Sequence, residues 1–125
     1  MKSVMFVVVS IVLMIGCQSG VGTVKGGRDV ITEEEIRNSN ETNLYDVIRK
    51  LRPMFLTSRG PKSLRLEEST LPLVYLDGTK YGEAESLRTM PIVGVQEIRF
   101  LDARDATTMY GTGHTSGIIM VITKK

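Results

Sequence analysis

An unbroken apolar run near the C-terminus constrains the fold more than any other feature of the sequence. The residues from Ile118 to Ile122 are all hydrophobic, so a strand formed there would be apolar on both of its faces. Such a strand belongs in the interior of a sheet that is covered on both sides. The sequence therefore predicts a central, doubly covered strand at the end of the chain.

Three other stretches have the pattern of strands. Leu71–Leu76 is apolar, and the Asp77-Gly78 pair after it is a strong turn signal that returns the chain through Thr79–Tyr81. Val95–Leu101 also reads as a strand, with Ile98 and Phe100 on one face and Glu97 and Arg99 on the other. Together with the C-terminal run, these stretches predict a sheet of about four strands.

Helical patterns precede and separate the strands. Thr32 and Glu35 have the spacing of a capping box, and Ile31 and Ile36 have that of a hydrophobic staple, so a short helix is expected from about residue 33 to 38–40. A second helix is predicted upstream of Pro53, where apolar residues follow the helical period: Leu44, Val47, Ile48 and Leu51. A shorter helical stretch is expected over 83–88, and a turn or a short helix over 102–110.

The order of these elements predicts an α+β fold, in which a small mixed sheet of about four strands is covered by two or three short helices. The sheet side of the core is expected to consist of Val74, Leu76, Ile98, Phe100, Ile119 and Val121. The apolar face of the second helix, with Leu44, Val47, Ile48 and Leu51, is expected to cover it.

The N-terminus has the pattern of a targeting signal. Lys2 precedes Val4–Ile15, a run of 12 residues that is apolar apart from Ser10. A membrane-spanning helix needs about 20 apolar residues, so this run is typical of a signal peptide. An ordinary secretory signal is one interpretation of it.

A lipoprotein signal is the other interpretation. The apolar run leads to Gly16 and Cys17, the only cysteine of the chain, and these residues resemble the lipobox of bacterial lipoproteins. The resemblance implies cleavage before Cys17 and lipid attachment to its thiol, with membrane lipid as the partner. Gln18 stands where an aspartate would favour the inner membrane, which implies an outer-membrane anchor facing the periplasm.

Composition argues against several classes of protein. The formal charge is only +2, too even for a nucleic-acid-binding surface. One cysteine and one histidine supply a metal site poorly, and we expect neither a metal nor a cofactor. The chain also offers too few strands for an outer-membrane barrel.

Each residue that could take part in catalysis or ligand binding also has a simpler, structural interpretation. Gly111, Gly113 and Gly117 precede a strand, whereas a dinucleotide-binding loop follows one, so they are interpreted as backbone turns. His114 is the candidate catalytic base of an alternative enzyme hypothesis, but no G-x-S-x-G motif accompanies it, and we expect no enzyme activity. Asp77 is expected to be a turn residue rather than a catalytic carboxylate.

Two charged clusters leave similar alternatives. The acidic run Glu33–Glu35 suits the positive end of a helix dipole better than a metal site. The basic residues Arg49, Lys50 and Arg52 suit the C-terminal end of the second helix, with phosphate or lipid binding as the alternative.

The order of several segments over residues 31–124 resembles the plug domain of TonB-dependent outer-membrane receptors. The segments are Asn43–Ile48 followed by Pro53, Arg59-Gly60, Leu73–Gly78, Val95–Leu101, Ala106, Tyr110-Gly111 and Ser116–Lys124. With the lipoprotein signal, the chain divides into a signal peptide (1–16) and a glycine-rich lipidated tether (17–27), and the resemblance to receptor plugs adds a plug-like domain (28–125).

The resemblance implies a binding role. The receptor's barrel and a convincing partner-binding box are not recognised in this sequence, so transport itself is not implied, but a partnership with an outer-membrane receptor barrel or a TonB-system protein is. The expected contact surface combines the 57–70 loop, through Arg59, Lys62 and Arg65, with the 111–116 region, through Tyr110 and His114. A structural or assembly lipoprotein of the cell envelope, without a ligand, is the alternative function.

Overall fold

The computed structural model describes residues 26–57 and 71–125. Within these residues the chain forms five strands, three α-helices and two 3₁₀-helices. In chain order they are β1 (Val30–Thr32), α1 (Glu33–Asn38), α2 (Leu44–Leu51), η1 (Pro53–Leu56), β2 (Leu73–Leu76), β3 (Thr79–Glu83), η2 (Ala84–Thr89), β4 (Val95–Leu101), α3 (Ala103–Tyr110) and β5 (Ile118–Thr123). None of these helices is long and apolar enough to cross a membrane.

The strands form one open mixed sheet in the order β1-β4-β5-β2-β3. Strand β5 lies in the middle, where it pairs antiparallel with β4 and parallel with β2. The α+β class and the central position of the last strand are therefore confirmed. The expected number of about four strands is too low by one, because β1 is a three-residue edge strand whose Ile31 and Thr32 were assigned only to the start of the first helix.

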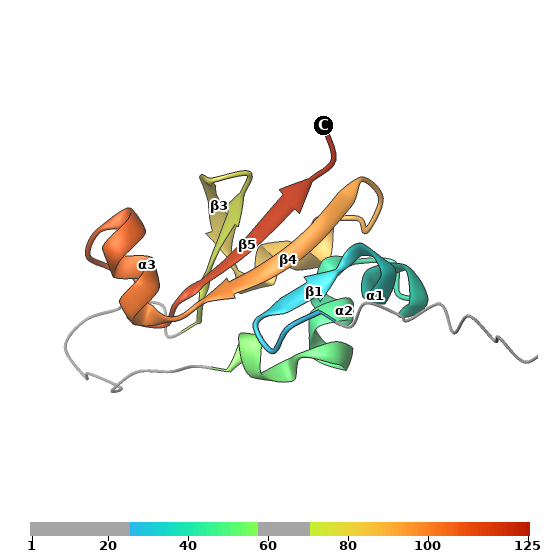
Figure 1. The fold of residues 1–125 in the computed structure, drawn as a ribbon, viewed down its shortest axis with the longest axis horizontal. Helices are drawn as coiled ribbons and strands as arrows, with labels where there is room; N and C mark the ends of the chain where they lie inside the picture. The colour runs from blue at the N-terminus through green and yellow to red at the C-terminus, as the bar shows by residue number, and fades with distance from the viewer. Residues whose placement is uncertain (1–25, 58–70) are drawn as a thin grey trace, which may run out of the picture.

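One face of the sheet carries the main core. Figure 1 shows α1 and α2 together on one side of the sheet, while α3 stands apart at the other end. The predicted core residues all belong to this cluster, although Leu51 and Leu76 are only partly buried. Phe55 of η1 and Leu87 of η2 are further fully buried members that the sequence analysis did not include.

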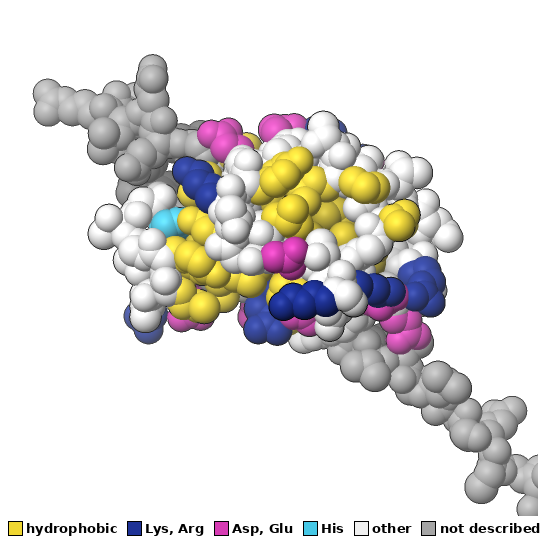
Figure 2. Space-filling model, turned by 90° about the horizontal axis from the view of Figure 1, so that it is seen from above, with side chains coloured by type: hydrophobic (Ala, Val, Ile, Leu, Met, Phe, Trp, Pro, Cys, Tyr) yellow, Lys and Arg dark blue, Asp and Glu magenta, His cyan; other side chains and the backbone are white. Residues whose placement is uncertain are grey.

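Among the described residues, the other face of the sheet is covered only at one end. There Ile118 is fully buried against Tyr75 and Ala106 of α3. Farther along β5, Met120 and Ile122 are only half-buried, so the predicted double cover of this strand is incomplete there. Seen from above, hydrophobic side chains gather near the centre of the surface, most charged ones lie toward its edge, and the single histidine lies to one side (Figure 2).

Local signals in the sequence set the ends of the helices as expected. Thr32 and Glu35 form both hydrogen bonds of the capping box, and Glu35 Oε2 accepts the Thr32 amide at 3.1 Å. Asn43 caps α2 by accepting the amide of Asp46, and α2 ends two residues before Pro53. The stretch predicted over 83–88 is a 3₁₀-helix, η2.

The predicted tether meets the fold at Gly26 and Gly27, the only part of it within the described residues. The Gly27 carbonyl accepts a hydrogen bond from the Val30 amide at 3.2 Å. A Cβ on Gly26 would lie 2.3 Å from the Val30 carbonyl oxygen, so the backbone passes too close for a side chain. These two glycines therefore belong to the turn that leads into β1.

Asp77 occupies the β2–β3 turn and also holds the end of β5. Asp77 and Gly78 both have positive φ angles, 49° and 87°, as a two-residue hairpin turn of type I′ requires. The Asp77 carboxylate accepts hydrogen bonds from the Thr123 amide (2.9 Å) and hydroxyl (2.7 Å). These bonds, the backbone one first, lower the pKa of Asp77 below its ordinary value. The role of Asp77 is thus structural.

We expect the Asp77→Asn variant to lose stability in a pH-dependent way. Since the folded-state pKa is lowered, the ionised carboxylate contributes stability above the unfolded pKa of about 4, and this contribution disappears as the pH falls through the folded value. Asparagine keeps the turn but carries no charge. Urea titrations from pH 6 down to pH 2 should therefore show the wild-type advantage shrinking in acid. A difference that stays constant with pH would contradict this assignment.

Candidate functional site

The predicted site residues fall into two groups. Cys17, Arg59, Lys62 and Arg65 lie outside the described residues, so the structure does not test the lipid anchor or the loop part of the contact surface. Tyr110 and His114 are described and lie near each other, with ring centroids 6.3 Å apart. The part of the predicted surface that can be examined is therefore built around these two side chains.

Tyr75 of β2 joins them to form an aromatic cluster. The Tyr75 ring centroid lies 4.7 Å from that of Tyr110 and 5.9 Å from that of His114. Tyr75 and His114 are both buried, whereas Tyr110 at the end of α3 is half-buried. The cluster thus joins α3 and the following loop to the sparsely covered face of the sheet.

Both ring nitrogens of His114 are engaged. Nδ1 lies 2.9 Å from the Gly111 carbonyl oxygen, which can only accept, so Nδ1 carries the proton and donates. In the neutral ring Nε2 is then an acceptor, and the Tyr75 hydroxyl donates to it at 2.9 Å. A catalytic base needs a free acceptor nitrogen that faces a substrate. This geometry instead gives His114 the role of fastening the 111–117 loop to β2.

The sequence analysis missed Tyr75 as a member of this site. Tyr75 was noted only as part of a strand, and its partner His114 lies 39 residues away in the sequence. The alternation of side chains along β2 could have indicated that Tyr75 belongs to the site. Tyr75 is two residues from Leu73, so both side chains lie on the face opposite Val74, where a phenol would need a polar partner.

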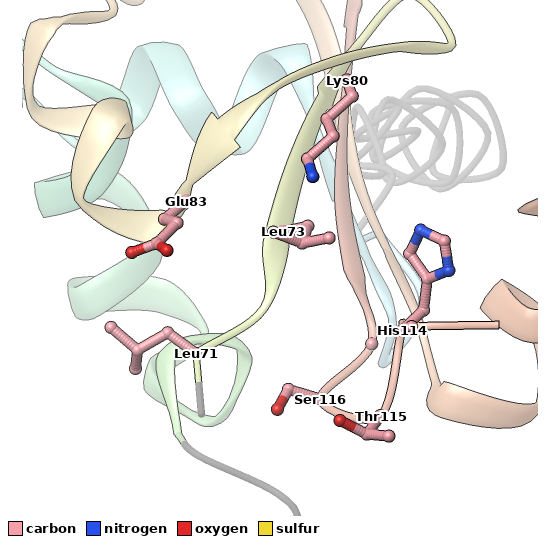
Figure 3. A pocket seen from close by; sticks show the side chains of 9 residues that line it. Leu71, Leu73, Lys80, Glu83, His114, Thr115 and Ser116 are labelled. Carbon is pink, nitrogen blue, oxygen red and sulfur yellow. The ribbon is translucent and has the colours of Figure 1, made fainter. Parts of the chain in front are cut away.

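A small pocket lies beside the aromatic cluster (Figure 3). It has a volume of about 210 Å³ and lies between the β2–β3 hairpin and the 113–117 loop. Its lining residues are Leu71, Leu73, Lys80, Glu83, Gly113, His114, Thr115, Ser116 and Gly117. In the close-up the Lys80 ammonium extends toward Leu73, and the Thr115 and Ser116 hydroxyls lie on the loop side.

The basic cluster considered for phosphate or lipid binding is largely engaged within the fold. Lys50 donates to the Ser39 carbonyl (2.6 Å) and to the Glu41 carboxylate (2.9 Å). Arg52 forms a partly buried ion pair with Glu35 at 3.2 Å. These contacts join α2 to α1 and to the turn between them. Two of the three basic residues of this cluster, Lys50 and Arg52, are therefore already engaged within the fold.

The acidic start of α1 is engaged in a similar way. The Glu33 carboxylate accepts a hydrogen bond from Lys124 Nζ at 2.6 Å and also forms an ion pair with Arg37. The Lys124 hydrogen bond is the main cause that lowers the pKa of Glu33. Within residues 26–57 and 71–125, no group of three or more His, Cys, Asp or Glu side chains is placed to hold a metal ion. The acidic run Glu33–Glu35 therefore stabilises the start of α1, and Glu33 also binds Lys124, the residue that follows β5.

No known protein-family model matches the sequence of this chain.

We expect the Tyr75→Phe variant to lose about 1–3 kcal/mol of its free energy of unfolding. The substitution leaves the buried Nε2 of His114 without a donor, and an unsatisfied buried polar group costs about that much. Urea denaturation followed by circular dichroism measures the loss. Tyr81→Phe is the matched control because Tyr81 is 50% exposed, and its effect should be within about 0.5 kcal/mol. Equal effects of the two variants would show that the hydrogen bond does not hold the loop.

Proposed function

We propose that this chain is a lipoprotein of the outer membrane, anchored through Cys17, whose plug-like domain faces the periplasm and assists TonB-dependent uptake. In this function the domain binds an outer-membrane receptor barrel or another protein of the TonB system. The anchor keeps the domain at the membrane that holds such receptors, while the glycine-rich residues between Cys17 and Gly26 serve as the tether that lets it reach them.

One observation supports this proposal more than any other. Three of the segments that carry the resemblance to receptor plug domains, Leu73–Gly78, Val95–Leu101 and Ser116–Lys124, supply β2 with its turn, β4 and β5. These strands are immediate neighbours in the order β4-β5-β2. Segments that are separate in the sequence thus form the middle of one sheet, as expected if they belong together as one ancestral unit.

The chemistry of the described residues favours binding over catalysis. His114, the residue of the enzyme alternative, has both ring nitrogens in hydrogen bonds that fix a loop. The sheet face beside it carries half-buried apolar residues, among them Leu73, Leu101 and Met120. A surface that carries apolar side chains is suited to recognising another protein.

The anchor is tested by metabolic labelling with a clickable fatty-acid probe. We expect the full-length wild-type protein to incorporate the probe and to fractionate with the outer membrane, because two or more acyl chains hold a protein durably. The Cys17→Ala variant should lose both the label and the membrane attachment. Ser19→Ala, two residues away, is the control and should behave as the wild type. Labelling that persists without Cys17 would contradict the proposal.

The partner is tested by purifying the tagged, lipidated chain from a detergent extract of the envelope. Co-purification of a receptor barrel or of a TonB-system protein supports an accessory role in uptake. Recovery of envelope-scaffold proteins alone would instead support a structural or assembly lipoprotein and overturn the proposed function.

A further inference from the structure

The face of β5 that lies opposite the main core is apolar along its length, but α3 covers only one end of it. Ile119 and Val121 belong to the main core. Side chains alternate along a strand, so Ile118, Met120 and Ile122 lie on the other face. Ile118 is fully buried there, whereas Met120 and Ile122 are half-buried. Among the described residues, this side of the sheet thus carries apolar side chains that nothing covers completely.

Two charged residues of β4 lie beside these apolar side chains. Ile98 belongs to the main core, so Glu97 and Arg99 lie on the opposite face of the sheet. In the β4–β5 register, Glu97 pairs with Ile122, and Arg99 pairs with Met120. We call the surface formed by these four side chains the open face. It consists of an acidic row, Glu97 and Ile122, next to a basic row, Arg99 and Met120.

The open face is complementary to itself. Consider a two-fold axis that lies parallel to the sheet, crosses its strands and passes between the two rows. Rotation about this axis places the acidic row of a second copy over the basic row of the first, and the reverse. Arg99 then faces Glu97 of the second copy, and Met120 faces Ile122. Packing of two sheets face to face, with nearly aligned strands about 10 Å apart, is a common arrangement in proteins.

We propose that two copies of this chain form a dimer through the open face, so that each copy completes the cover of β5 in the other. Met120 and Ile122 of both copies lose contact with water at the centre of the interface. Glu97 and Arg99 form an ion pair within one chain at 2.8 Å. In the dimer the two ion pairs lie over each other with opposite charges facing, which makes one network of four charges.

The charge pattern is the reason for choosing a second copy as the partner. Any other protein must present an acid and a base in the reverse order beside two apolar side chains, whereas this chain already does so. The open face is small compared with the about 20–30 residues a side of a standard interface, so the dimer is weak and reversible. This inference goes beyond the proposed envelope function and depends on neither the lipid anchor nor a receptor partner.

Cross-linking through an introduced cysteine detects a weak dimer of this kind. Sheets about 10 Å apart are too far from each other for a direct disulfide, so a short bis-maleimide is used. We expect Met120→Cys in the purified full chain, held in detergent micelles, to give a cross-linked product of twice the mass of the chain. Met109→Cys is the matched control, because Met109 is 63% exposed on α3 and lies outside the open face. The wild type measures any reaction of Cys17, which all the variants share.

Charge-reversal variants on the Met120→Cys background test the pairing itself. Glu97→Arg leaves two basic side chains on the open face, and Arg99→Glu leaves two acidic ones. Each variant alone should dimerise about tenfold more weakly or worse, because like charges then face each other. An equal mixture of the two variants should recover the cross-linked product, since every arginine then faces a glutamate of the other copy. Such recovery cannot arise from damage to the fold.

Three results would overturn the proposal. The first is a Met120→Cys chain that cross-links no more than Met109→Cys. The second is a mixture of the two charge-reversal variants that cross-links no better than either variant alone. The third is a double reversal, Glu97→Arg with Arg99→Glu in one chain, that fails to dimerise, because exchange of the two charges keeps the face complementary to itself.

Discussion

The Gly117→Ala variant is expected to lose about 3 kcal/mol or more of its free energy of unfolding. Gly117 has a φ angle of +85°, and a Cβ added there would lie 2.5 Å from the Leu101 carbonyl oxygen and 2.9 Å from Cζ of Phe100. Neither neighbour can yield easily. The carbonyl belongs to β4, and the Phe100 ring is buried in the main core. Backbone strain and overpacking each cost about 1–3 kcal/mol. Urea denaturation of the purified protein measures the loss.

Gly113→Ala is the control that separates these two costs. Gly113 lies in the same loop with a φ angle of +96°, but a Cβ there would meet nothing within 4 Å. Its substitution should therefore cost only the backbone strain, about 1 kcal/mol. If the two variants lose equal stability, the close approach of Leu101 and Phe100 to Gly117 does not limit the residue at this position.

The parts of the fold that the sequence predicted well are those encoded by neighbouring residues. The capping box at Thr32, the turn at Asp77-Gly78 and the end of α2 before Pro53 each depend on a few consecutive positions. Alternation from Glu97 to Phe100 indicated β4, and the predicted bounds of that strand, Val95–Leu101, are confirmed. These signals were sufficient for the α+β class because each marks one element.

The features that the sequence did not predict depend on contacts between distant residues. Strand β1 has three residues, too few for an alternating pattern, and exists because Ile31 pairs with Ile98 of β4. Met120 is only half-buried because α3 covers little of the sheet, and no local sequence pattern encodes that. The same holds for the candidate site, where Tyr75 and His114 meet only through the fold.

The candidate pocket shows why composition alone gave no ligand. The chain has 16 basic and 14 acidic residues, and such an even balance predicts nothing about single side chains. The structure shows which of these charged side chains form ion pairs within the fold. Arg52 and Lys124 are engaged in ion pairs that join elements of the fold, whereas Lys80 and Glu83 lie on the edge strand beside a cavity.

The Phe55→Ala variant is expected to lose about 3–5 kcal/mol of its free energy of unfolding. Phe55 of η1 is fully buried, and its ring stacks on that of Phe100 with centroids 5.0 Å apart and an interplanar angle of 14°. It therefore links the segment after α2 to the middle of the sheet. Removal of a buried phenylalanine side chain costs about 3–5 kcal/mol in hydrophobic transfer and cavity formation. Such a loss is a large fraction of the stability of a domain of this size.

Met54→Ala provides the comparison, because Met54 is the preceding residue of the same 3₁₀-helix and its side chain is 37% exposed. Its substitution changes the local backbone preference in a similar way but empties no cavity in the core, so a loss of less than about 1 kcal/mol is expected. Thermal and urea denaturation of both variants should then separate them clearly. If Phe55→Ala proves as mild as Met54→Ala, η1 is not held against the sheet, and the main core ends at α2.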